Sequence, residues 1–380
     1  MKHHYIEHLR KEQRMTQRLG VLGLGSVFWG PYGSIIQKLM IDGRVELVAG
    51  YDTDPGKREA ATRRFGMDTS ASDADALIGR DDIDVVVILT SMNDHGGLAK
   101  AALEAGKHVL VEKPMATSLE EAQALIEAEE ASGKVLVCAP HVVLSRTYRE
   151  MHTRVRRGDV GTLLLGRARY GWSGPWWGRW FYETGGGALF DLGVYNLTSL
   201  CGFFGSVQRV TAFVGVAIPK RMAEGEVVDV VSDDNAHVLL DFGEGRFASI
   251  ATGFTMQKYR SPAVELYGSD GVIQMLGDDW APEGFEQWSN ERGSWEVVPE
   301  SAPNWPWTDG LRHLVDCAED GSKPLNTSRH SYHALEVMLA AKRSAEEGRV
   351  MEIHSEFPDI AYVGDYDEES DRRQHDPRSS

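Results

Sequence analysis

A lysine, an aspartate and a tyrosine stand where their side chains could serve a proton transfer. Asp191 and Tyr195 are four residues apart in a stretch that predicts a helix over residues 188–200, so both project from one face of it. Lys113 follows a predicted strand and precedes Pro114, and such an X-Pro bond at a turn is a candidate for cis geometry. A carboxylate beside a phenol can equally form a buried hydrogen bond, so this stretch alone leaves both interpretations open.

The composition is typical of a soluble globular protein, with 42% hydrophobic and 26% charged residues. A chain of 380 residues is too long for one ordinary core, so two domains are expected. The formal net charge of −17 argues against binding to nucleic acid or to an anionic membrane. The first 18 residues lack the apolar segment of a signal peptide and no run of 18 apolar residues occurs, so we predict a cytoplasmic protein.

No metal site is predicted from the sequence. The cysteines Cys138, Cys201 and Cys317 are widely spaced and form no CxxC pair, so each is expected to be a small buried hydrophobe. The acidic segment 233–235 could hold a cation, but acidic turn residues ahead of a strand are commoner. His330 and His333 share a helix face without a partner carboxylate or cysteine.

The first βαβ unit carries a glycine-containing turn. An apolar strand over residues 18–24 runs into Gly23-Leu24-Gly25, a helical segment follows to about Met40, and residues 45–51 predict a second strand. The two glycines allow backbone N–H groups to approach a pyrophosphate. Phe28 replaces the third small residue of the dinucleotide-binding pattern, which implies either a looser helix–strand contact or an aromatic ring near the cofactor. The predicted cofactor-binding residues of this turn are Gly23, Gly25, Ser26, Val27 and Phe28.

Asp52 closes the second strand of this unit. A carboxylate there can accept hydrogen bonds from both ribose hydroxyls and would repel a 2′-phosphate, which favours NAD over NADP. Four basic side chains nearby keep NADP open: Lys57, Arg58, Arg63 and Arg64.

The alternation of strands and helices continues to residue 139 and predicts a doubly wound parallel sheet. Further strands are expected over residues 84–89, 108–111 and 135–138, and Ser118 with Glu121 predicts a capped helix start. Residues at the carboxyl ends of parallel strands face the ligand crevice. The further predicted cofactor-binding residues are therefore Thr90, Ser91, Asn93, His95, Glu112 and Lys113.

The pattern changes beyond residue 140. Alternating runs between residues 163 and 275 predict an open, mostly antiparallel sheet, with helices on one face and a second subunit on the other. The stretch 280–307 is expected to be irregular, with two helices after it. The predicted division is a flexible leader over 1–17, a dinucleotide-binding domain over 18–139, an α+β substrate and oligomerisation domain over 140–358, and a disordered acidic tail over 359–380.

Residues 171–180 contain four of the ten tryptophans in a segment whose glycines and proline predict a loop. Tryptophan faces stack against the apolar faces of sugars, although a core or subunit-interface cluster is an equal alternative for each ring. The candidate substrate-binding residues are Trp176, Trp177, Trp180, His141 and Arg169.

Taken together, these motifs resemble the Gfo/Idh/MocA oxidoreductase family, over roughly residues 19–353. The resemblance rests on the Gly23-x-Gly25 turn, Glu112-Lys113-Pro114 and Gly185-Gly186-Gly187 followed by Asp191 and Tyr195. It implies a Rossmann domain, a C-terminal domain with an open sheet, and dimers or tetramers formed through that sheet. The family lysine and aspartate correspond to Lys113 and Asp191. Many members carry histidine at the position of Tyr195, whereas the glucose-fructose oxidoreductase and dihydrodiol dehydrogenase members resemble this chain in having tyrosine.

The resulting hypothesis is an NAD(P)-dependent enzyme that transfers a hydride between nicotinamide and a secondary alcohol or ketone of a sugar, polyol, glycoside or cyclic diol. Tyr195 is expected to act as the general base in oxidation, with Lys113 lowering its pKa and stabilising the alkoxide. Asp191 is expected to orient the substrate hydroxyls or Lys113. The alternative is a non-catalytic sensor of nucleotide and sugar on the same fold.

Overall fold

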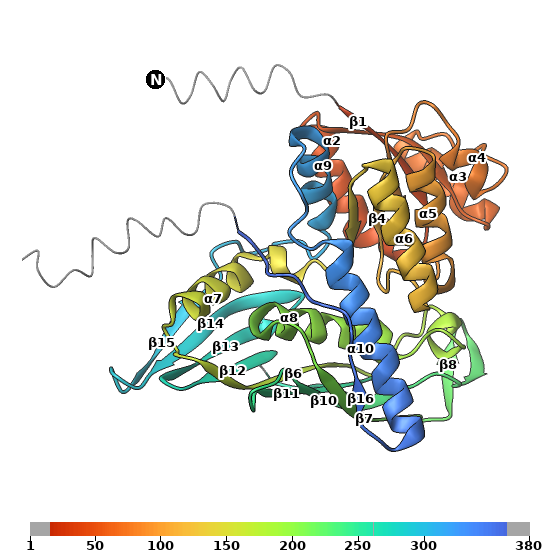
Figure 1. The fold of residues 1–380 in the computed structure, drawn as a ribbon. Helices are drawn as coiled ribbons and strands as arrows, with labels where there is room; N and C mark the ends of the chain where they lie inside the picture. The colour runs from red at the N-terminus through yellow and green to blue at the C-terminus, as the bar shows by residue number, and fades with distance from the viewer. Residues whose placement is uncertain (1–15, 261, 363–380) are drawn as a thin grey trace, which may run out of the picture.

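The computed structural model describes residues 16–260 and 262–362, which form two lobes (Figure 1). The predicted leader and acidic tail fall mainly on residues 1–15 and 363–380, outside the described residues. At the tail's predicted start, Ile360 is buried and the Tyr362 hydroxyl donates to the Val143 carbonyl at 2.6 Å. The chain therefore stays packed against the fold to the end of the described range. Within residues 16–260 and 262–362, none of the helices is long and apolar enough to cross a membrane.

The upper lobe is a parallel sheet between two layers of helices, as predicted. Its strands run in the order β2-β1-β3-β4-β5. They are β1 (Gln17–Leu22), β2 (Val45–Tyr51), β3 (Val85–Ile88), β4 (His108–Val111) and β5 (Leu136–Cys138). Every residue of β3 and β5 is buried, which explains why these strands read as continuous apolar runs.

The helices of this lobe are α2 (Gly33–Ile41), α3 (Pro55–Phe65), α4 (Ala74–Ile78), α5 (His95–Glu104) and α6 (Leu119–Ser132). Three of them, α3, α4 and α6, begin at a side-chain cap and end at a glycine. Ser118 caps α6 as predicted, since its hydroxyl accepts the Glu121 N–H at 3.2 Å. The Glu121 carboxylate accepts the N–H of Thr117, so only half of a capping box forms. Gly133 ends α6 in the left-handed conformation.

The lower lobe is a nine-stranded sheet with helices on one face (Figure 1). Its order is β15-β14-β13-β12-β6-β11-β10-β7-β16, and the neighbours are antiparallel except for β6 and β11. The strands are β6 (Leu163–Gly171), β7 (Arg209–Gly215), β10 (Asn235–Asp241), β11 (Phe247–Gly253), β12 (Val264–Gly268), β13 (Gly271–Asp278), β14 (Ala281–Ser289), β15 (Ser294–Pro299) and β16 (Met351–Glu352). A separate hairpin, β8 (Lys220–Ala223) and β9 (Glu226–Asp229), stands beside the sheet. The covering helices are α7 (Arg146–Arg157), α8 (Val194–Phe204) and α10 (Ser328–Glu347).

The expectation of an irregular stretch over residues 280–307 was wrong, because β14 and β15 occupy most of it. Prolines obscured the pattern, since Pro282 and Pro299 lie near strand ends, where a missing N–H is tolerated. Gly284 has a φ of +107° within β14 next to a register irregularity. Two strands interrupted by prolines and a local kink therefore resembled a loop.

The last part of the chain returns to the upper lobe. Helix α9 (Gly310–Asp320) packs against α2, β4 and β5, and Leu311, Leu314 and Val315 join the core of the Rossmann lobe. The predicted division at residue 140 places α9 in the second domain, so a division by sequence alone does not follow the packing. Because α9 packs on the upper lobe and α10 contacts both α6 of the upper lobe and β7 of the lower lobe, the C-terminal helices tie the two lobes together.

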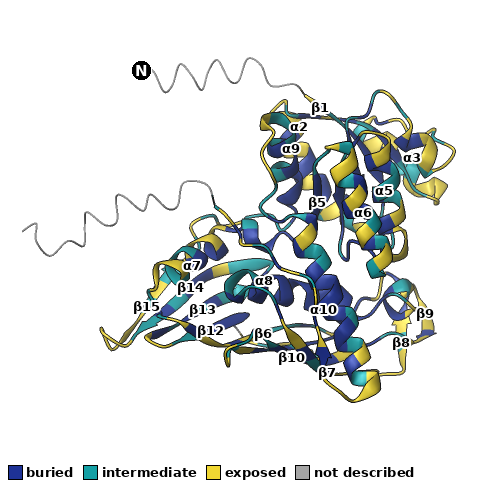
Figure 2. Cartoon of the chain, viewed as in Figure 1, coloured by how far each residue is buried: buried dark blue, intermediate teal, exposed yellow. Residues whose placement is uncertain are grey.

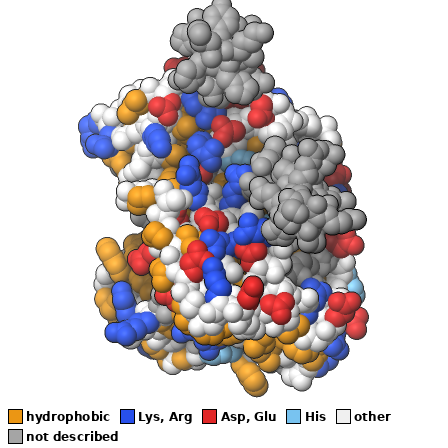
Figure 3. Space-filling model, turned by 90° about the vertical axis from the view of Figure 1, so that its left-hand side faces the viewer, with side chains coloured by type: hydrophobic (Ala, Val, Ile, Leu, Met, Phe, Trp, Pro, Cys, Tyr) orange, Lys and Arg blue, Asp and Glu red, His pale blue; other side chains and the backbone are white. Residues whose placement is uncertain are grey.

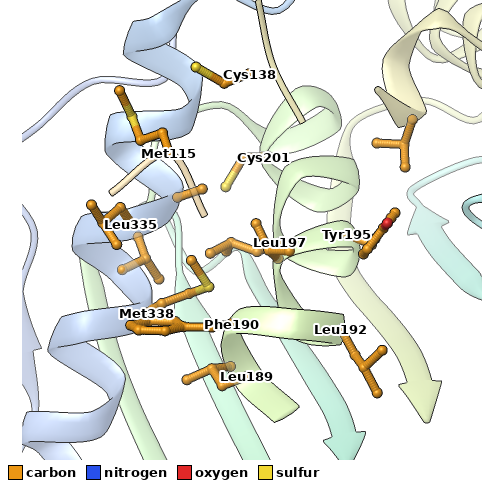
Figure 4. Packing of buried hydrophobic residues seen from close by; sticks show 14 of the residues in the cluster. Met115, Cys138, Leu189, Phe190, Leu192, Tyr195, Leu197, Cys201, Leu335 and Met338 are labelled. Atoms are coloured by element: carbon orange, nitrogen blue, oxygen red, sulfur yellow. The ribbon is translucent and has the colours of Figure 1, made fainter. Parts of the chain in front are cut away.

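Helix α8 is held by apolar contacts on one side. Buried residues fill the layer between α8, α10 and the sheet (Figure 2). Leu197 and Cys201 point toward Leu335 on α10, whereas Tyr195 points to the other side of α8 (Figure 4). The free cysteines are buried, as predicted. One face of α8 therefore anchors the helix and leaves the face that carries Tyr195 directed at the site.

Candidate active site

The turn after β1 is shaped for close backbone approach. Gly23 has a φ of +91°, and a Cβ there would lie 2.5 Å from the Leu89 carbonyl oxygen. A Cβ on Gly25 would meet nothing within 4 Å, so the turn is open on that side. The Leu24 N–H donates to Asp52 Oδ2 at 2.8 Å and fixes the turn beside the end of β2. The turn thus leaves room for a pyrophosphate next to Gly25.

Phe28 lies in the core and not at the open side of this turn. It is fully buried, with its ring centroid 5.4 Å from those of Trp29 and Phe65. The helix starts with a wide π-helical turn, η1 (Phe28–Tyr32), which includes Pro31. Of the two readings of Phe28, this arrangement fits the looser helix–strand contact.

Asp52 lies at the end of β2 and keeps hydrogen-bonding capacity. Its Oδ1 accepts the Asp54 N–H at 2.9 Å, and its Oδ2 lies 3.6 Å from Lys57 Nζ. Arg58 donates to the Asp52 carbonyl at 2.6 Å. Each carboxylate oxygen can accept a further hydrogen bond from a ribose hydroxyl. The Asp52 carboxylate, which favours NAD, therefore lies beside Lys57 and Arg58, two of the basic residues that could accommodate NADP.

The loop after β3 is tied to the loop after β4 by His95. The ring is buried, with Nδ1 2.8 Å from the Pro114 carbonyl oxygen and Nε2 3.2 Å from the Thr90 carbonyl oxygen. Burial lowers the pKa of His95. The Lys113–Pro114 peptide bond is cis, as predicted. The His95 side chain therefore positions the crevice loops, and Ser91, whose hydroxyl donates to Asp94 Oδ2 at 2.7 Å, orders the same loop.

Each glycine of Gly185-Gly186-Gly187 has a steric reason to be small. A Cβ on Gly185 would lie 2.3 Å from Asn93 Oδ1, on the crevice loop of the upper lobe. On Gly186 it would lie 2.5 Å from the Trp180 carbonyl oxygen, and on Gly187 2.3 Å from Asp233 Oδ1. Gly185 and Gly187 also have positive φ values of +91° and +111°. The three glycines therefore let the two lobes and the aromatic loop meet at one point.

The predicted helix over residues 188–200 begins with a second π-helical turn, η5 (Leu189–Gly193), before α8. Asp233 caps its start, because Asp233 Oδ2 accepts the Leu189 N–H at 2.8 Å. A Cβ on Gly193 would lie 2.7 Å from Leu189 Cδ1 and 3.2 Å from Thr252 Cγ2 of β11. Gly193 therefore leaves room for Leu189 of its own helix and for the neighbouring strand β11.

Lys113, Asp191 and Tyr195 meet at the centre of the crevice. Lys113 Nζ forms an ion pair with Asp191 Oδ1, and the two side chains are only 12% and 10% exposed. Lys113 Nζ also lies 5.6 Å from the centroid of the Tyr195 ring. Three residues that are far apart in the sequence thus form a buried cluster of a cation, a carboxylate and a phenol.

The surroundings of Tyr195 raise the pKa of its phenol well above the ordinary value. Burial is the largest cause, followed by the charge of Glu112 and the neighbouring Tyr170 and Asp191. This direction is opposite to the expected lowering by Lys113, because burial of the phenol and the negative charges around it dominate. The Tyr195 hydroxyl makes no hydrogen bond to any group in residues 16–260 and 262–362.

Sequence reasoning missed Tyr32, which ends η1. Its hydroxyl donates to Glu112 Oε1 at 2.8 Å, and both residues are buried. Glu112 Oε2 also accepts the Lys113 N–H at 3.2 Å. An aromatic residue soon after the glycine turn was the available signal, but nothing in the sequence connected it with a carboxylate 80 residues away. Tyr32 and Glu112 thereby hold the backbone that carries Lys113.

Two candidate substrate residues are not brought to the cluster. Arg169 of β6 pairs with Glu265 at 3.3 Å, on the face of the sheet opposite to Tyr170, whose ring contacts Tyr195. Successive strand residues point to opposite faces, so Arg169 and Tyr170 cannot share one pocket. His141 is 1% exposed. A Cβ on Gly310 would lie 2.2 Å from Cε1 of the His141 ring. His141 therefore packs against the start of α9.

The aromatic loop packs onto the triple-glycine segment through its backbone. Trp176 and Trp177 are exposed, and Trp177 stacks on Trp172 with ring centroids 5.3 Å apart. Trp180 stacks on Phe181 at 3.6 Å, and the Gly187 N–H donates to the Phe181 carbonyl at 2.9 Å. The loop therefore offers exposed aromatic faces on a segment joined directly to the cluster.

The acidic segment 233–235 is used by ion pairs. Asp234 is fully buried and pairs with Arg221 at 3.0 Å, and Asp233 pairs with Lys342 at 2.8 Å. His330 lies at the start of α10, where Nδ1 accepts the Thr327 N–H at 2.8 Å. Across residues 16–260 and 262–362, no group of three or more His, Cys, Asp or Glu side chains could hold a metal ion.

Comparison with protein families explains this combination of lobes. Residues 17–139 match the model described as "Oxidoreductase family, NAD-binding Rossmann fold", and residues 148–274 match the GFO/IDH/MocA C-terminal domain. The chain belongs to the Gfo/Idh/MocA family. It is therefore an NAD(P)-dependent oxidoreductase, and the glycine turn, open at Gly25 and bordered by Asp52, has the shape and donors that a dinucleotide requires.

Several curated relatives of this chain are sugar and polyol dehydrogenases. D-apiose dehydrogenase of Paraburkholderia graminis is 26% identical over 83% of this chain and 84% of its own length. Levoglucosan dehydrogenase of Pseudarthrobacter phenanthrenivorans is 27% identical over 75% of this chain and 76% of its own. Scyllo-inositol 2-dehydrogenase (NAD(+)) of Bacillus subtilis is 24% identical over 88% and 96% of the two chains.

Solved structures share the whole fold. Levoglucosan dehydrogenase in complex with NADH and levoglucosan superposes with a TM-score of 0.77 at 21% identity, covering 89% of this chain and 100% of that chain. GenD2 from gentamicin A biosynthesis, in complex with NAD, gives a TM-score of 0.73 at 26% identity, with 90% and 98% covered. Both lobes of the fold, and the way they are joined, are therefore common to these proteins.

Proposed function

We propose that this protein transfers a hydride between a nicotinamide dinucleotide and a secondary alcohol or ketone of a sugar, polyol, glycoside or cyclic diol. The observation that carries the proposal is the buried Lys113–Asp191 ion pair beside the Tyr195 phenol at the carboxyl end of the parallel sheet. The names of the curated relatives support the substrate class. When bound, the nicotinamide supplies or accepts the hydride at C4.

Lys113 acts as the electrostatic group in this proposal. Its ammonium donates to the substrate oxygen and stabilises the negative charge that develops there. Asp191 holds the ammonium in place, since the two groups are paired away from water. Asp191 also accepts hydrogen bonds from neighbouring substrate hydroxyls with its remaining lone pairs.

Tyr195 exchanges the proton with the substrate oxygen. Since its surroundings raise the pKa of the phenol, Tyr195 is protonated at neutral pH and is ready to donate to a ketone oxygen during reduction. In alcohol oxidation it takes the hydroxyl proton as the base, so that direction gains rate as the pH rises. The hydroxyl is available for this work because no group within the described ranges holds it.

The cofactor is held by the turn after β1 and by the strand ends. Gly23 and Gly25 accommodate the pyrophosphate, and Ser26, Val27 and Phe28 shape the start of the helix behind it. Asp52 accepts from the ribose hydroxyls, which favours NAD, although Lys57 leaves NADP as a second cofactor. Thr90, Ser91, Asn93, His95 and Glu112 order the crevice near the nicotinamide.

Exposed aromatic rings form one wall of the proposed substrate site. Trp176, Trp177 and Trp180 lie on the loop whose backbone packs against Gly186, and a sugar ring could stack on their faces. We further propose assembly as a homodimer or homotetramer through the uncovered face of the lower sheet. Exposed hydrophobic side chains on that face, Leu165, Phe213, Leu239 and Phe247, support it, and hydrophobic atoms gather at the lower edge in Figure 3.

A panel screen tests the proposal. NAD and NADP reduction is followed at 340 nm with D-apiose, levoglucosan, scyllo-inositol, myo-inositol, glucose and a benzene dihydrodiol. Turnover of at least one compound that is lost in Lys113→Met and Tyr195→Phe supports the proposal. Binding of nucleotide and sugar without turnover of any compound, with identical behaviour of both variants, would support a sensor instead.

A further inference from the structure

A buried carboxyl group stands behind the tyrosine of the site. Asp279 lies in the turn between β13 and β14 and is 1% exposed. Its Oδ2 accepts hydrogen bonds from Asn196 Nδ2 at 2.8 Å and from Ser199 Oγ at 3.3 Å, both on α8. Asn196 follows Tyr195 directly in the chain, so this carboxyl group is attached to the turn of α8 that carries the phenol.

This cluster has unused hydrogen-bonding groups. Asp279 Oδ1, Asn196 Oδ1 and Trp280 Nε1 are buried and have no hydrogen-bond partner among the described residues. A well-packed structural hydrogen bond would leave few such atoms, because each unpartnered buried group costs about 1–3 kcal/mol. Half of the Asp279 carboxyl group is therefore not used to hold the fold.

The rings around Asp279 connect it to the site. Trp280 lies 6.2 Å from Tyr170, and Tyr170 lies edge-on to Tyr195 with centroids 5.6 Å apart. The titratable groups that sense Asp279 are Asp278 at the end of β13, Tyr195 of α8, Tyr170 of β6, Tyr148 of α7 and Tyr259 after β11. Tyr195 is faced in addition by Glu112, Asp191, Tyr32 and Lys113.

We propose that Asp279 is a positioning residue of the reaction, which holds the first turn of α8 and, through its negative charge, controls how readily Tyr195 releases its proton. This inference rests on the proposed role of Tyr195. It gives the buried carboxyl group a function that its hydrogen bonds to Asn196 and Ser199 alone do not require.

The chemistry of the cluster supports this control. Burial raises the pKa of Asp279 to about 7, against an ordinary value of 3.8, and the negative charge of Asp278 adds to the effect. Asp279 therefore gains its charge within the working pH range of an enzyme. Once ionised, it opposes a second negative charge on Tyr195 and raises the pKa of the phenol.

The test compares Asp279→Asn with Asp278→Asn, using the most active compound of the panel. Asparagine has the same shape and keeps the acceptor for Asn196, but it has no charge. The alkaline limb of the pH profile, where ketone reduction falls and alcohol oxidation reaches its plateau, should move to lower pH in Asp279→Asn. Asp278→Asn makes the same charge change one residue earlier, at the end of β13, in a carboxylate that bonds Tyr259, and should leave the limb in place.

A milder variant covers the case in which Asp279→Asn does not fold. Ser199→Ala removes one hydrogen bond that favours the ionised carboxyl group, so the inflection near pH 7 in the wild-type profile should move upward. An unmoved alkaline limb in Asp279→Asn, an equal shift in Asp278→Asn, or an unmoved inflection in Ser199→Ala overturns the inference. Failure of the proposed function is recognised separately, because Tyr195→Phe would then keep both turnover and the alkaline limb.

Discussion

Two π-helical turns, η1 and η5, each follow a glycine-containing turn and each bring a tyrosine to the crevice. Tyr32 ends η1, and its hydroxyl donates to Glu112 at 2.8 Å. Tyr195 stands directly after η5, where its hydroxyl has no hydrogen-bond partner within the described residues and its ring faces Lys113. Burial raises the pKa of both phenols.

The difference between the two turns lies in what their tyrosines contact. Wide turns of this kind are frequent at functional sites, but the local shape is shared by both and so does not decide the role. The phenol at η1 holds Glu112 next to Lys113, while the phenol after η5 has no hydrogen-bond partner among the described residues. A site residue is therefore better identified by its unused hydrogen-bonding capacity and its neighbours than by the turn that carries it.

The largest expected effect is a difference in turnover between variants of the two tyrosines. Tyr195→Phe removes the proton carrier and should lower kcat by about 10³-fold, within the range of general acid–base catalysis. Tyr32→Phe should lower it less than tenfold, because Tyr32 acts through Glu112. Steady-state rates at 340 nm check both, and equal losses in the two variants would erase the distinction.

The buried carboxyl group of Asp279, which bonds to α8 directly after η5, should make the stability of the protein depend on pH. The pKa of Asp279 is raised in the folded protein, so the folded state keeps a proton that the unfolded chain releases, and stability falls as the pH rises from about 4 to about 7. Asp279→Asn removes this loss. Its stability relative to wild type, measured by urea unfolding, should rise by about 3 kcal/mol between pH 4 and pH 8. A difference that is constant with pH would contradict the burial of an ionisable group there.

The glycines that precede the two turns should fail in different ways. Gly187→Ala puts a Cβ 2.3 Å from Asp233 at a φ of +111°, so it should cost about 2 kcal/mol of stability. Gly25→Ala meets nothing within 4 Å and should keep the stability of wild type while weakening NAD binding about tenfold. Thermal unfolding and fluorescence titration with NAD separate the two outcomes. A stable Gly187→Ala protein would show that the steric account of η5 is wrong.

The smallest effect concerns the hydrogen bond of the first turn. Tyr32→Phe leaves the buried Glu112 without one donor and should cost about 1.5 kcal/mol of stability. Tyr195→Phe removes no hydrogen bond to the described residues and should leave the stability nearly unchanged. Chemical denaturation of the two variants side by side gives the comparison, and a larger loss in Tyr195→Phe would mean that its hydroxyl holds the fold.

Much of the fold could be predicted from the sequence because most of its strands are clear apolar or alternating runs of residues. The buried strands β2 and β4 were placed at their observed bounds from their apolar runs, and Ser118 located the start of α6. The strands β14 and β15 were missed, since Pro282 and Gly284 interrupt their alternation. Local patterns of hydrophobicity were therefore reliable where the chain was regular, and failed at a kink.

The site could be predicted where the residues follow a fixed motif. The pairing of Lys113 with Asp191 agrees with their expected meeting. The hydrogen-bond partners of Tyr32 and Asp279 lie about 80 residues away in the sequence, so no local sequence pattern could predict these contacts. Arg169 was misplaced because its direction depends on the register of β6, which is set by the sheet as a whole.

The central claim is that Lys113 supplies charge to the reaction and not to cofactor binding. The most direct measurement is the turnover of Lys113→Met at saturating NAD, together with the dissociation constant of NAD from fluorescence titration. The account predicts a loss of turnover of about 10³-fold, since an aimed charge is removed from a site away from water, with an NAD affinity within a few-fold of wild type. Near-normal turnover in a variant that binds NAD normally would contradict it.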